Sequence, residues 1–253
     1  MTWLPVDCHA HTVFSDGTLD PESLAALVRS RGARPSVADH ISTDVAYAVK
    51  SVEDIRAYLD ALERTDVLRG GEFCWHDPLW RAVPPDLVRR FTHRVGSLHA
   101  VQLADDSWVH MFQKRLPAGL DHDAYMDAHV ATLERFAAAM PVDILAHPTL
   151  LPLPWRKVPL EELWTEAREE GAVAALARGG IAFEISNRYR PHERFVRRAV
   201  AAGVRISLGS DGHTPEQVGD LAFPLALARA AGVADADLYD PSAHGSRTQE
   251  GPR

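Results

Sequence analysis

Histidine and carboxylate side chains follow the ends of short hydrophobic runs along most of this chain. Without paired thiolates, such groups are typical ligands of zinc, manganese or iron ions. A metal site needs ligands within bonding distance, so this pattern requires a fold that gathers distant strand ends at one place. The residues concerned are His9, His11, Asp16, His40, Glu72, His99, His147, Asp211 and His213. We therefore predict a multinuclear metal centre.

The size of this set indicates more than one ion. Nine potential ligands exceed the needs of a single four-coordinate ion, so we expect two or three divalent ions. Glu72 is the natural bridging ligand, because an anion between two cations reduces their repulsion. Ions held roughly 3.5–4 Å apart can share a hydroxide nucleophile and clamp both oxygens of an in-line displacement. The residue types favour phosphate-ester hydrolysis, but they do not distinguish zinc, manganese and iron.

Each motif by itself also has an ordinary structural interpretation. A pair such as His9 and His11 is often a polar strand end, Asp16 fits a turn, and the glycines before Glu72 can mark another turn. The metal interpretation depends on the alignment of six of the thirteen histidines with strand ends. We expect the others to be solvated: His76, His93, His110, His122, His129, His192 and His244.

Seven short apolar segments, separated by amphipathic helical patterns, position these side chains. The expected strands lie at 4–9, 35–39, 67–73, 94–98, 142–146, 181–186 and 204–209. Helix start signals stand between them, such as Asp20 before Pro21 and Ser51 before an apolar stripe. This alternation predicts an α/β fold with a parallel sheet, either closed as a barrel or open and doubly wound.

The distribution of the ligands decides between these two architectures. In a barrel the C-terminal ends of all strands surround one mouth, whereas an open sheet gathers only the strands near its switch point. We therefore favour a barrel of about seven βα units in one domain, residues 1–239. Long connections at 101–120 and 148–159 would shape substrate binding, and we expect 240–253 to be a disordered tail.

Composition limits the classes of partner. The chain has 27 basic and 35 acidic residues, and its net charge of −8 disfavours broad binding to nucleic acid or anionic membranes. Cys8 and Cys74 are too few for a disulfide scaffold and fit a reducing cytoplasm, and we expect Cys8 in the core. No apolar run approaches the roughly 20 residues of a membrane span. The sequence also lacks a nucleophilic serine elbow, a P-loop and a dinucleotide-binding glycine motif.

The assembled motifs resemble those of the PHP family, named for polymerase and histidinol phosphatase. DCHAHTVFSDG, ADH, GGE, GSLH, AHP and SDGH occur in the family's order between Asp7 and His213. The resemblance implies a distorted (β/α)7 TIM-like barrel with a trinuclear site. The ligand groups it implies are His9, His11, Glu72 and Asp211 for one ion; Glu72, His99 and His147 for a second; and Asp16, His40 and His213 for the third.

Departures from the family pattern are mild near the ligands. Ala38 stands where threonine is frequent, and Gly212 where alanine is common. In FEISNRYR, Asn187 is displaced by one position relative to the family's Glu-Ile-Asn-like motif. Arg188 or Arg190 would lie near the mouth, where a guanidinium can bind two phosphate oxygens, and we choose Arg188. The expected catalytic side chains are therefore His213, Asp211 and Arg188.

Three functions remain open on these grounds. The first is a metal-dependent phosphomonoesterase acting on a small phosphorylated substrate, with histidinol phosphate as the leading candidate and His213 or a metal-bound water as proton donor to the leaving group. The second is a phosphodiesterase or nuclease-like activity on nucleotides or oligonucleotide ends, for which the supporting residues are Trp108, Lys114, Arg115, Trp155, Arg156 and Lys157. The third is a metal-binding module without turnover, which the intact ligand set disfavours.

Overall fold

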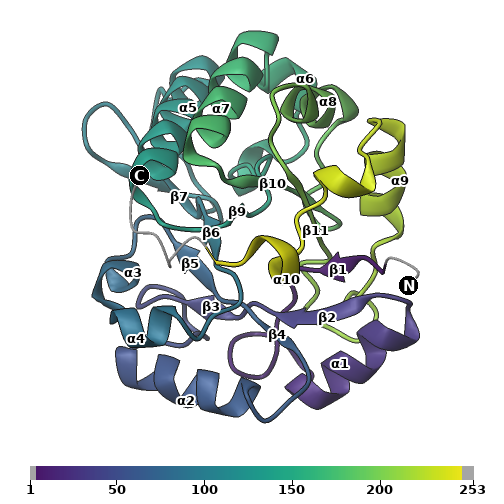
Figure 1. The fold of residues 1–253 in the computed structure, drawn as a ribbon. Coiled ribbons are helices and arrows are strands. Elements are labelled where there is room, and N and C mark those ends of the chain that lie inside the picture. The colour runs from purple at the N-terminus through teal and green to yellow at the C-terminus, as the bar shows by residue number, and fades with distance from the viewer. Residues whose placement is uncertain (1–3, 247–253) are drawn as a thin grey trace.

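A ring of short parallel strands lies at the centre of the structure, and helices surround it (Figure 1). The structure is a computed structural model and describes residues 4–246. The strands of the ring are β1 (Val6–Asp7), β2 (Arg34–Val37), β3 (His40–Ile41), β4 (Leu68–Arg69), β5 (Glu72–Cys74), β6 (Val95–Ser97), β9 (Ile144–Leu145), β10 (Ala182–Ser186) and β11 (Ile206–Gly209). Each of the seven predicted segments therefore overlaps an observed strand, although the observed strands are shorter than expected.

Backbone hydrogen bonds close these strands into a barrel. Parallel pairing runs β1-β2-β4 in one part and β3-β5-β6-β9-β10-β11 in the other. Segments β2 and β3 follow one another along one strand position, as do β4 and β5, which leaves seven positions. The ring closes where Cys8 N donates to the Leu208 carbonyl at 2.9 Å and Asp211 N donates to the His9 carbonyl at 2.8 Å. The predicted α/β class and distorted (β/α)7 TIM-like barrel are confirmed.

The helices begin where the sequence places capping residues. Asp20 accepts a hydrogen bond from Ser23 N at 2.8 Å ahead of α1, and Ser51 accepts one from Asp54 N at 3.0 Å ahead of α2. The helices are α1 (Pro21–Ser30), α2 (Val52–Leu62), α3 (Leu79–Ala82), α4 (Pro85–Val88), α5 (His122–Ala139), α6 (Leu160–Leu163), α7 (Glu166–Gly179), α8 (Glu193–Ala201), α9 (Ala222–Ala230) and α10 (Pro241–His244), with 3-10 turns at Leu153–Trp155 and Asp235–Asp237.

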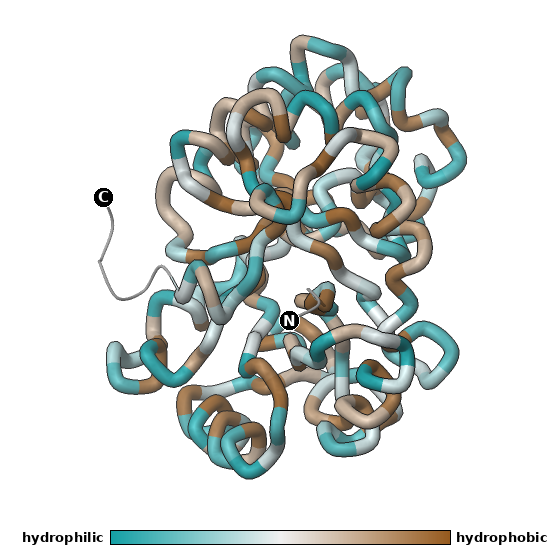
Figure 2. The backbone as a smooth tube through the Cα atoms, turned by 45° about the vertical axis from the view of Figure 1, so that its right-hand side comes forward, coloured by the Kyte–Doolittle hydropathy of each residue, from teal (hydrophilic) through white to brown (hydrophobic). Residues whose placement is uncertain are grey.

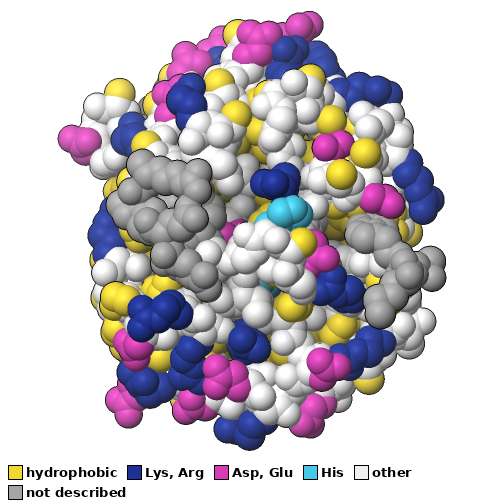
Figure 3. Space-filling view, in the orientation of Figure 1, with side chains coloured by type: hydrophobic (Ala, Val, Ile, Leu, Met, Phe, Trp, Pro, Cys, Tyr) yellow, Lys and Arg dark blue, Asp and Glu magenta, His cyan; other side chains and the backbone are white. Residues whose placement is uncertain are grey.

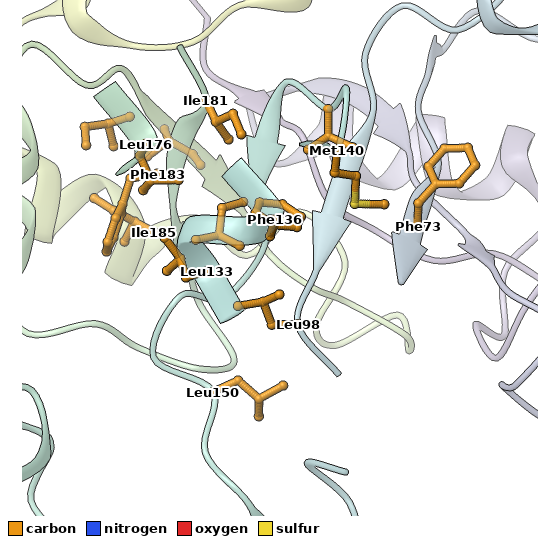
Figure 4. Packing of buried hydrophobic residues seen from close by; sticks show 14 of the residues in the cluster. Phe73, Leu98, Leu133, Phe136, Met140, Leu150, Leu176, Ile181, Phe183 and Ile185 are labelled. Carbon is orange, nitrogen blue, oxygen red and sulfur yellow. The ribbon is translucent and has the colours of Figure 1, made fainter. Parts of the chain in front are cut away.

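The core has two layers, one inside the barrel and one between the barrel and its helices. The inner layer consists mainly of small and branched side chains, with one tyrosine: Val6, Cys8, Ala38, Val95, Ile144, Ala146, Ala182 and Tyr239. In the outer layer, Leu133 and Phe136 of α5 belong to the same cluster as Phe183 and Ile185 of β10 (Figure 4). Hydrophobic segments accordingly concentrate towards the interior of the tube drawing (Figure 2). Cys8 is fully buried, as predicted.

The connection at 101–120 contains a feature that the sequence analysis missed. Strands β7 (Ala100–Gln102) and β8 (Trp108–His110) form an antiparallel hairpin beside the end of β6. Val101 and Val109 of the hairpin are buried, while Trp108 remains partly exposed. The hairpin therefore belongs to the folded body and borders the C-terminal end of the barrel.

Residues 240–246 are not the disordered tail that we expected. Asp240 caps α10 by accepting a hydrogen bond from Ser242 N at 2.8 Å, and its carboxylate pairs with Arg34 at 2.5 Å. This pairing ties α10 to the start of β2, because Arg34 is the first residue of that strand. The remainder of the expected tail, 247–253, lies outside the described residues.

The visible surface carries both signs of charge. On the face shown in Figure 3, lysine and arginine side chains are interspersed with aspartate and glutamate. Within residues 4–246, no helix is long and apolar enough to cross a membrane.

Candidate metal centre

The structure brings all nine predicted ligands together at the C-terminal end of the barrel. Four of them, His9, His99, His147 and Asp211, each stand two residues after the last residue of a strand. The remaining ones begin strands β3 and β5 or lie in the adjoining loops: His40, Glu72, His11, Asp16 and His213. This end of a βα barrel is where the loops converge, which explains how residues 11 and 213 become neighbours.

Glu72 lies in the middle of the assembly. Its Oε1 is 3.2 Å from His147 Nε2 and 3.3 Å from His99 Nε2. Its Oε2 is 2.5 Å from His40 Nδ1 and 3.6 Å from His9 Nε2. The glutamate is fully buried, and the close contact between His40 Nδ1 and Oε2 lacks the angles of a hydrogen bond, so Oε2 has no hydrogen-bond partner within residues 4–246. A buried carboxylate oxygen in that state suits the bridging role predicted for Glu72.

A second group of ligand atoms surrounds His11. The Nε2 atoms of His9 and His11 are 3.1 Å apart, and His11 Nε2 is 3.4 Å from Asp211 Oδ1. On its other side, Asp16 Oδ1 is 3.2 Å from His213 Nε2 and 3.8 Å from His11 Nδ1. The rings of His11 and His213 stack with centroids 4.1 Å apart. The third group, Asp16 with His213, therefore adjoins the first through His11.

These separations match the spacing of ligands around a small divalent ion. Zn–N and Zn–O bonds of 2.0–2.2 Å place two ligands of a tetrahedral ion roughly 3.3 Å apart. The observed separations of 3.1 Å for His9 and His11, 3.4 Å for His99 and His147, and 3.5 Å for Asp16 and His40 cluster around that value. The donor set therefore fits divalent metal ions, and the division into three ligand groups remains a prediction.

The electrostatics of the centre also favour cations. Burial by itself would raise the pKa of Glu72, but the imidazoles of His40 and His99 outweigh it and hold that pKa well below its usual value. Burial also opposes ionisation of Asp211, yet the hydrogen bond with His11 leaves its pKa below the usual range. Buried carboxylates that stay ionised require positive partners, and metal ions would supply them.

Glu184 is the main residue that the sequence analysis missed. It is fully buried in β10, and its Oε1 lies 2.8 Å from His9 Nδ1 while Oε2 accepts a hydrogen bond from His147 N at 2.6 Å. Holding Nδ1 of His9 in this way directs Nε2 into the centre. A Cβ atom on Gly209 would lie only 2.1 Å from Glu184 Oε1, so glycine is needed there. The sequence signal that could have identified Glu184 is the alternation of side chains along a strand, which places Ala182 and Glu184 on the inward face of β10.

Backbone strain marks two of the ligand positions. His147 and Asp211 have positive φ values of 30° and 50°, a region that non-glycine residues enter rarely. Hydrogen bonds hold both: Glu184 accepts from His147 N, and Asp211 N donates to the His9 carbonyl. Strained backbone that the surroundings hold in place is common at functional sites.

The two arginines considered for phosphate binding lie in different places. Arg188 Nη1 is 2.7 Å from His213 Nδ1 and 4.0 Å from Asp211 Oδ1, at the edge of the centre. Arg190 instead bonds the Asn187 carbonyl and stacks over a phenylalanine ring. Asn187, the displaced motif residue, donates to Asp220 at 3.0 Å. Only Arg188 of this pair is therefore at the centre.

Arg156, expected only as a possible contact for a nucleic-acid chain, also lies close to the centre. Its guanidinium lies over the rings of Phe112 and Tyr189, with the group 4.9 Å and 5.3 Å from their centroids. Tyr189 in turn meets the ring of His147, and Phe112 meets that of His99. We call Phe112, Tyr189 and Arg156 the aromatic rim, and this rim borders the ligands His99 and His147.

The expectation that the other seven histidines are solvated was wrong for His93 and His129, which are buried, and the side chains of His76 and His192 are only 10% and 9% exposed. His93 is fully buried between Ser36 Oγ at 3.2 Å and the Cys8 carbonyl at 3.0 Å, and burial lowers its pKa to about 4. His129 is buried against the ring of Trp164, and burial lowers its pKa to about 4 as well. The sequence around these two histidines gave no sign of their burial, because both rings pack as ordinary core residues.

Comparison with known proteins identifies relatives in structure only. No protein-family model matches the chain, and the comparison with curated proteins gives no match. A histidinol phosphate phosphatase from Lactococcus lactis, solved in complex with zinc, L-histidinol and phosphate, is similar with a TM-score of 0.70. That similarity covers 96% of this chain and 97% of the other at 14% identity. The chain has the fold of this phosphatase.

A second solved structure supports the same relationship. It is a putative histidinol phosphatase from Listeria monocytogenes, similar with a TM-score of 0.66 and 14% identity over 85% of this chain and 97% of the other. Near-complete coverage of both neighbours means that the histidinol phosphatase fold accounts for the whole barrel.

Proposed function

We propose that this protein is a metal-dependent phosphomonoesterase of the PHP family. The observation that carries the proposal is the buried Glu72 carboxylate, which lies within 3.6 Å of four imidazoles contributed by different strand ends. A structural zinc site has no need of so many convergent ligands, since four suffice. An excess of ligands around one bridging carboxylate is typical of multinuclear hydrolase centres.

The ligands would hold two or three divalent ions in the groups predicted from the sequence. His9, His11 and Asp211 lie together, His99 and His147 flank Glu72, and His40 and His213 flank Asp16. Ions bound there would supply charge neutralisation and water of lowered pKa. The zinc in the Lactococcus lactis structure makes zinc the first ion to test, ahead of manganese and iron.

The chain's own residues would position the phosphate and the leaving group. Arg188 can bind two phosphate oxygens in a fork, because its guanidinium lies at the edge of the centre and is 40% exposed. Without metal, burial opposes protonation of His213, but the Asp16 hydrogen bond raises its pKa above the usual value. An ion held by Asp16 and His213 would displace that proton, so a metal-bound water is the better proton donor to the departing alkoxide. Asp211 orients His213, whose Nδ1 lies 2.9 Å from the Asp211 carbonyl.

The proposed substrate is a small phosphomonoester, with histidinol phosphate first. The neighbour from Lactococcus lactis was solved with L-histidinol and phosphate, the two products expected from that ester. On the face shown in Figure 3, basic side chains alternate with acidic ones, and the net charge of −8 disfavours a long nucleic acid. Free, buried cysteines at positions 8 and 74 agree with a location in the reducing cytoplasm.

The test is release of inorganic phosphate by zinc-, manganese- or iron-loaded protein. We expect turnover of histidinol phosphate by the wild-type chain and its loss in the Glu72→Gln variant, which keeps the shape but removes the bridging charge. A panel of sugar phosphates, nucleotides and short oligonucleotides separates the alternatives. Cleavage of the oligonucleotides without turnover of any monoester would support the diesterase, and metal binding without hydrolysis of any substrate would support the non-catalytic module.

A further inference from the structure

Three metal-capable side chains meet outside the candidate centre, on the rim of the barrel mouth. His76 Nε2 lies 2.9 Å from Asp44 Oδ2, and His110 Nδ1 lies 3.9 Å from the same oxygen. The two imidazole rings are perpendicular, with centroids 5.2 Å apart. One ligand atom from each residue lies within 4.8 Å of the other two. The three ligand atoms therefore lie close together, although they come from the connections after β3 and β5 and from strand β8.

The backbone at each position is fixed by its surroundings. Asp77, directly after His76, is buried and accepts hydrogen bonds from Thr43 N at 2.6 Å and Asp44 N at 3.2 Å. The loop carrying Asp44 is thereby fastened to the segment carrying His76. His110 pairs with Ala100 across the β7–β8 hairpin, and the neighbouring amide of Met111 donates to the His99 carbonyl at 2.9 Å. A ligand set on supported backbone is preorganised for an ion.

The geometry points to a metal site. We propose that Asp44, His76 and His110 bind one divalent transition-metal ion of the zinc type, separately from the candidate centre. Ligands of such an ion lie roughly 3.3 Å apart, and the observed 2.9 Å and 3.9 Å separations bracket that value. Two imidazoles and one carboxylate form a donor set that suits zinc and its neighbours better than calcium or magnesium.

Because the site lies on the rim of the barrel mouth, a bound ion would help to hold the shape of that mouth. Asp44 and His110 have side chains that are 55% and 46% exposed, so water completes the coordination and the ion exchanges with solvent. The bound ion joins the connection after β3, the connection after β5 and the end of β8. It thereby fixes the hairpin beside His99 and the aromatic rim. This inference stands independently of the proposed phosphatase activity.

Zinc titration of the metal-free, full-length protein by calorimetry tests the site. The variants Asp44→Asn and His110→Gln each remove a ligand that is largely at the surface, so the core stays intact. We expect each to bind one zinc equivalent fewer than the wild type. The control is His122→Gln, which removes an exposed imidazole outside the cluster and retains the full number.

Amide hydrogen exchange supplies a second measurement. Zinc should slow exchange in β7 and β8 of the wild type and of Glu72→Gln, but not in His110→Gln. Retention of the effect in Glu72→Gln separates this site from the candidate centre, because that variant weakens only the latter. An unchanged zinc count in both rim variants, or equal protection of the hairpin in His110→Gln and wild type, would overturn the proposal.

Discussion

Replacing Glu184 by glutamine tests how the centre is supported from behind. The carboxylate faces two donors at once, because His9 Nδ1 lies 2.8 Å from Oε1 and His147 N donates to Oε2 at 2.6 Å. Glutamine has nearly the same shape, so it introduces no cavity. Its side chain offers only one acceptor oxygen, however, and the amide group must then face one of the two donors.

The expected loss follows from that mismatch. A buried donor left without an acceptor costs about 1–3 kcal/mol, and the whole environment of Glu184 is buried. If the imidazole of His9 turns away to relieve the mismatch, Nε2 leaves its position 3.1 Å from His11 Nε2. Removal of a group that orients a metal ligand typically weakens metal binding about 10–100-fold. We therefore expect zinc affinity to fall by one to two orders of magnitude.

Zinc affinity is measured by competition with a chromophoric chelator, and stability by denaturant unfolding of the metal-free protein. The matched control is Glu169→Gln, since Glu169 is equally buried but its carboxylate bonds His192, Arg194 and Arg198 rather than a predicted ligand. The control should lose stability and keep its zinc affinity. Wild-type zinc affinity in Glu184→Gln would refute the reasoning.

Three further outcomes are expected. Arg188→Ala should lower kcat/KM for the phosphomonoester about 10–100-fold, by roughly 1.4–2.8 kcal/mol of lost phosphate binding, with zinc content unchanged and Arg190→Ala near wild type in the same assay. Gly209→Ala places a Cβ 2.1 Å from Glu184 Oε1 and should destabilise the fold by at least about 1–3 kcal/mol in denaturant unfolding. His129 has a pKa of about 4 when folded and 6.5 when unfolded, so its contribution to stability is lost as pH falls from 6.5 towards 4. Between pH 7 and 5 the loss from His129 is roughly 2 kcal/mol, so the decline should be smaller by that amount in His129→Gln, while the equal contribution of His93 remains; an equally steep decline in the variant would contradict it.

The strand pattern was predictable because hydrophobic runs and polar strand ends are local features. The runs at 142–146 and 204–209 contain β9 and β11, and the polar residues that follow them are His147 and Asp211. The interruption of a strand between β2 and β3 was not predictable, since it depends on bonds such as that from Ala38 N to the Ala10 carbonyl. Register and breaks are set by neighbouring strands, which a single segment does not reveal.

The residues missed at the site were missed for a related reason. Glu184 stands inside an apolar run, where a charged residue is tolerated only because His9 and the amide of His147 meet it. Those partners lie 175 and 37 positions away in the chain, so local pattern cannot supply them. The error for His129 was the opposite one, because we expected a solvated side chain. Its imidazole instead packs against Trp164 as an aromatic core residue would.

The closure of β1 against β11 has a consequence for how the protein matures. His9 emerges early in synthesis, but Asp211 and His213 become available only when almost the entire chain has been made. The amide of Asp211 donates to the carbonyl of His9, so the same contact that seals the ring also brings together His9 and Asp211 of the first predicted ligand group. Ions would therefore bind at this position only after β11 has paired with β1. A nascent chain without β11 would lack part of the ligand set.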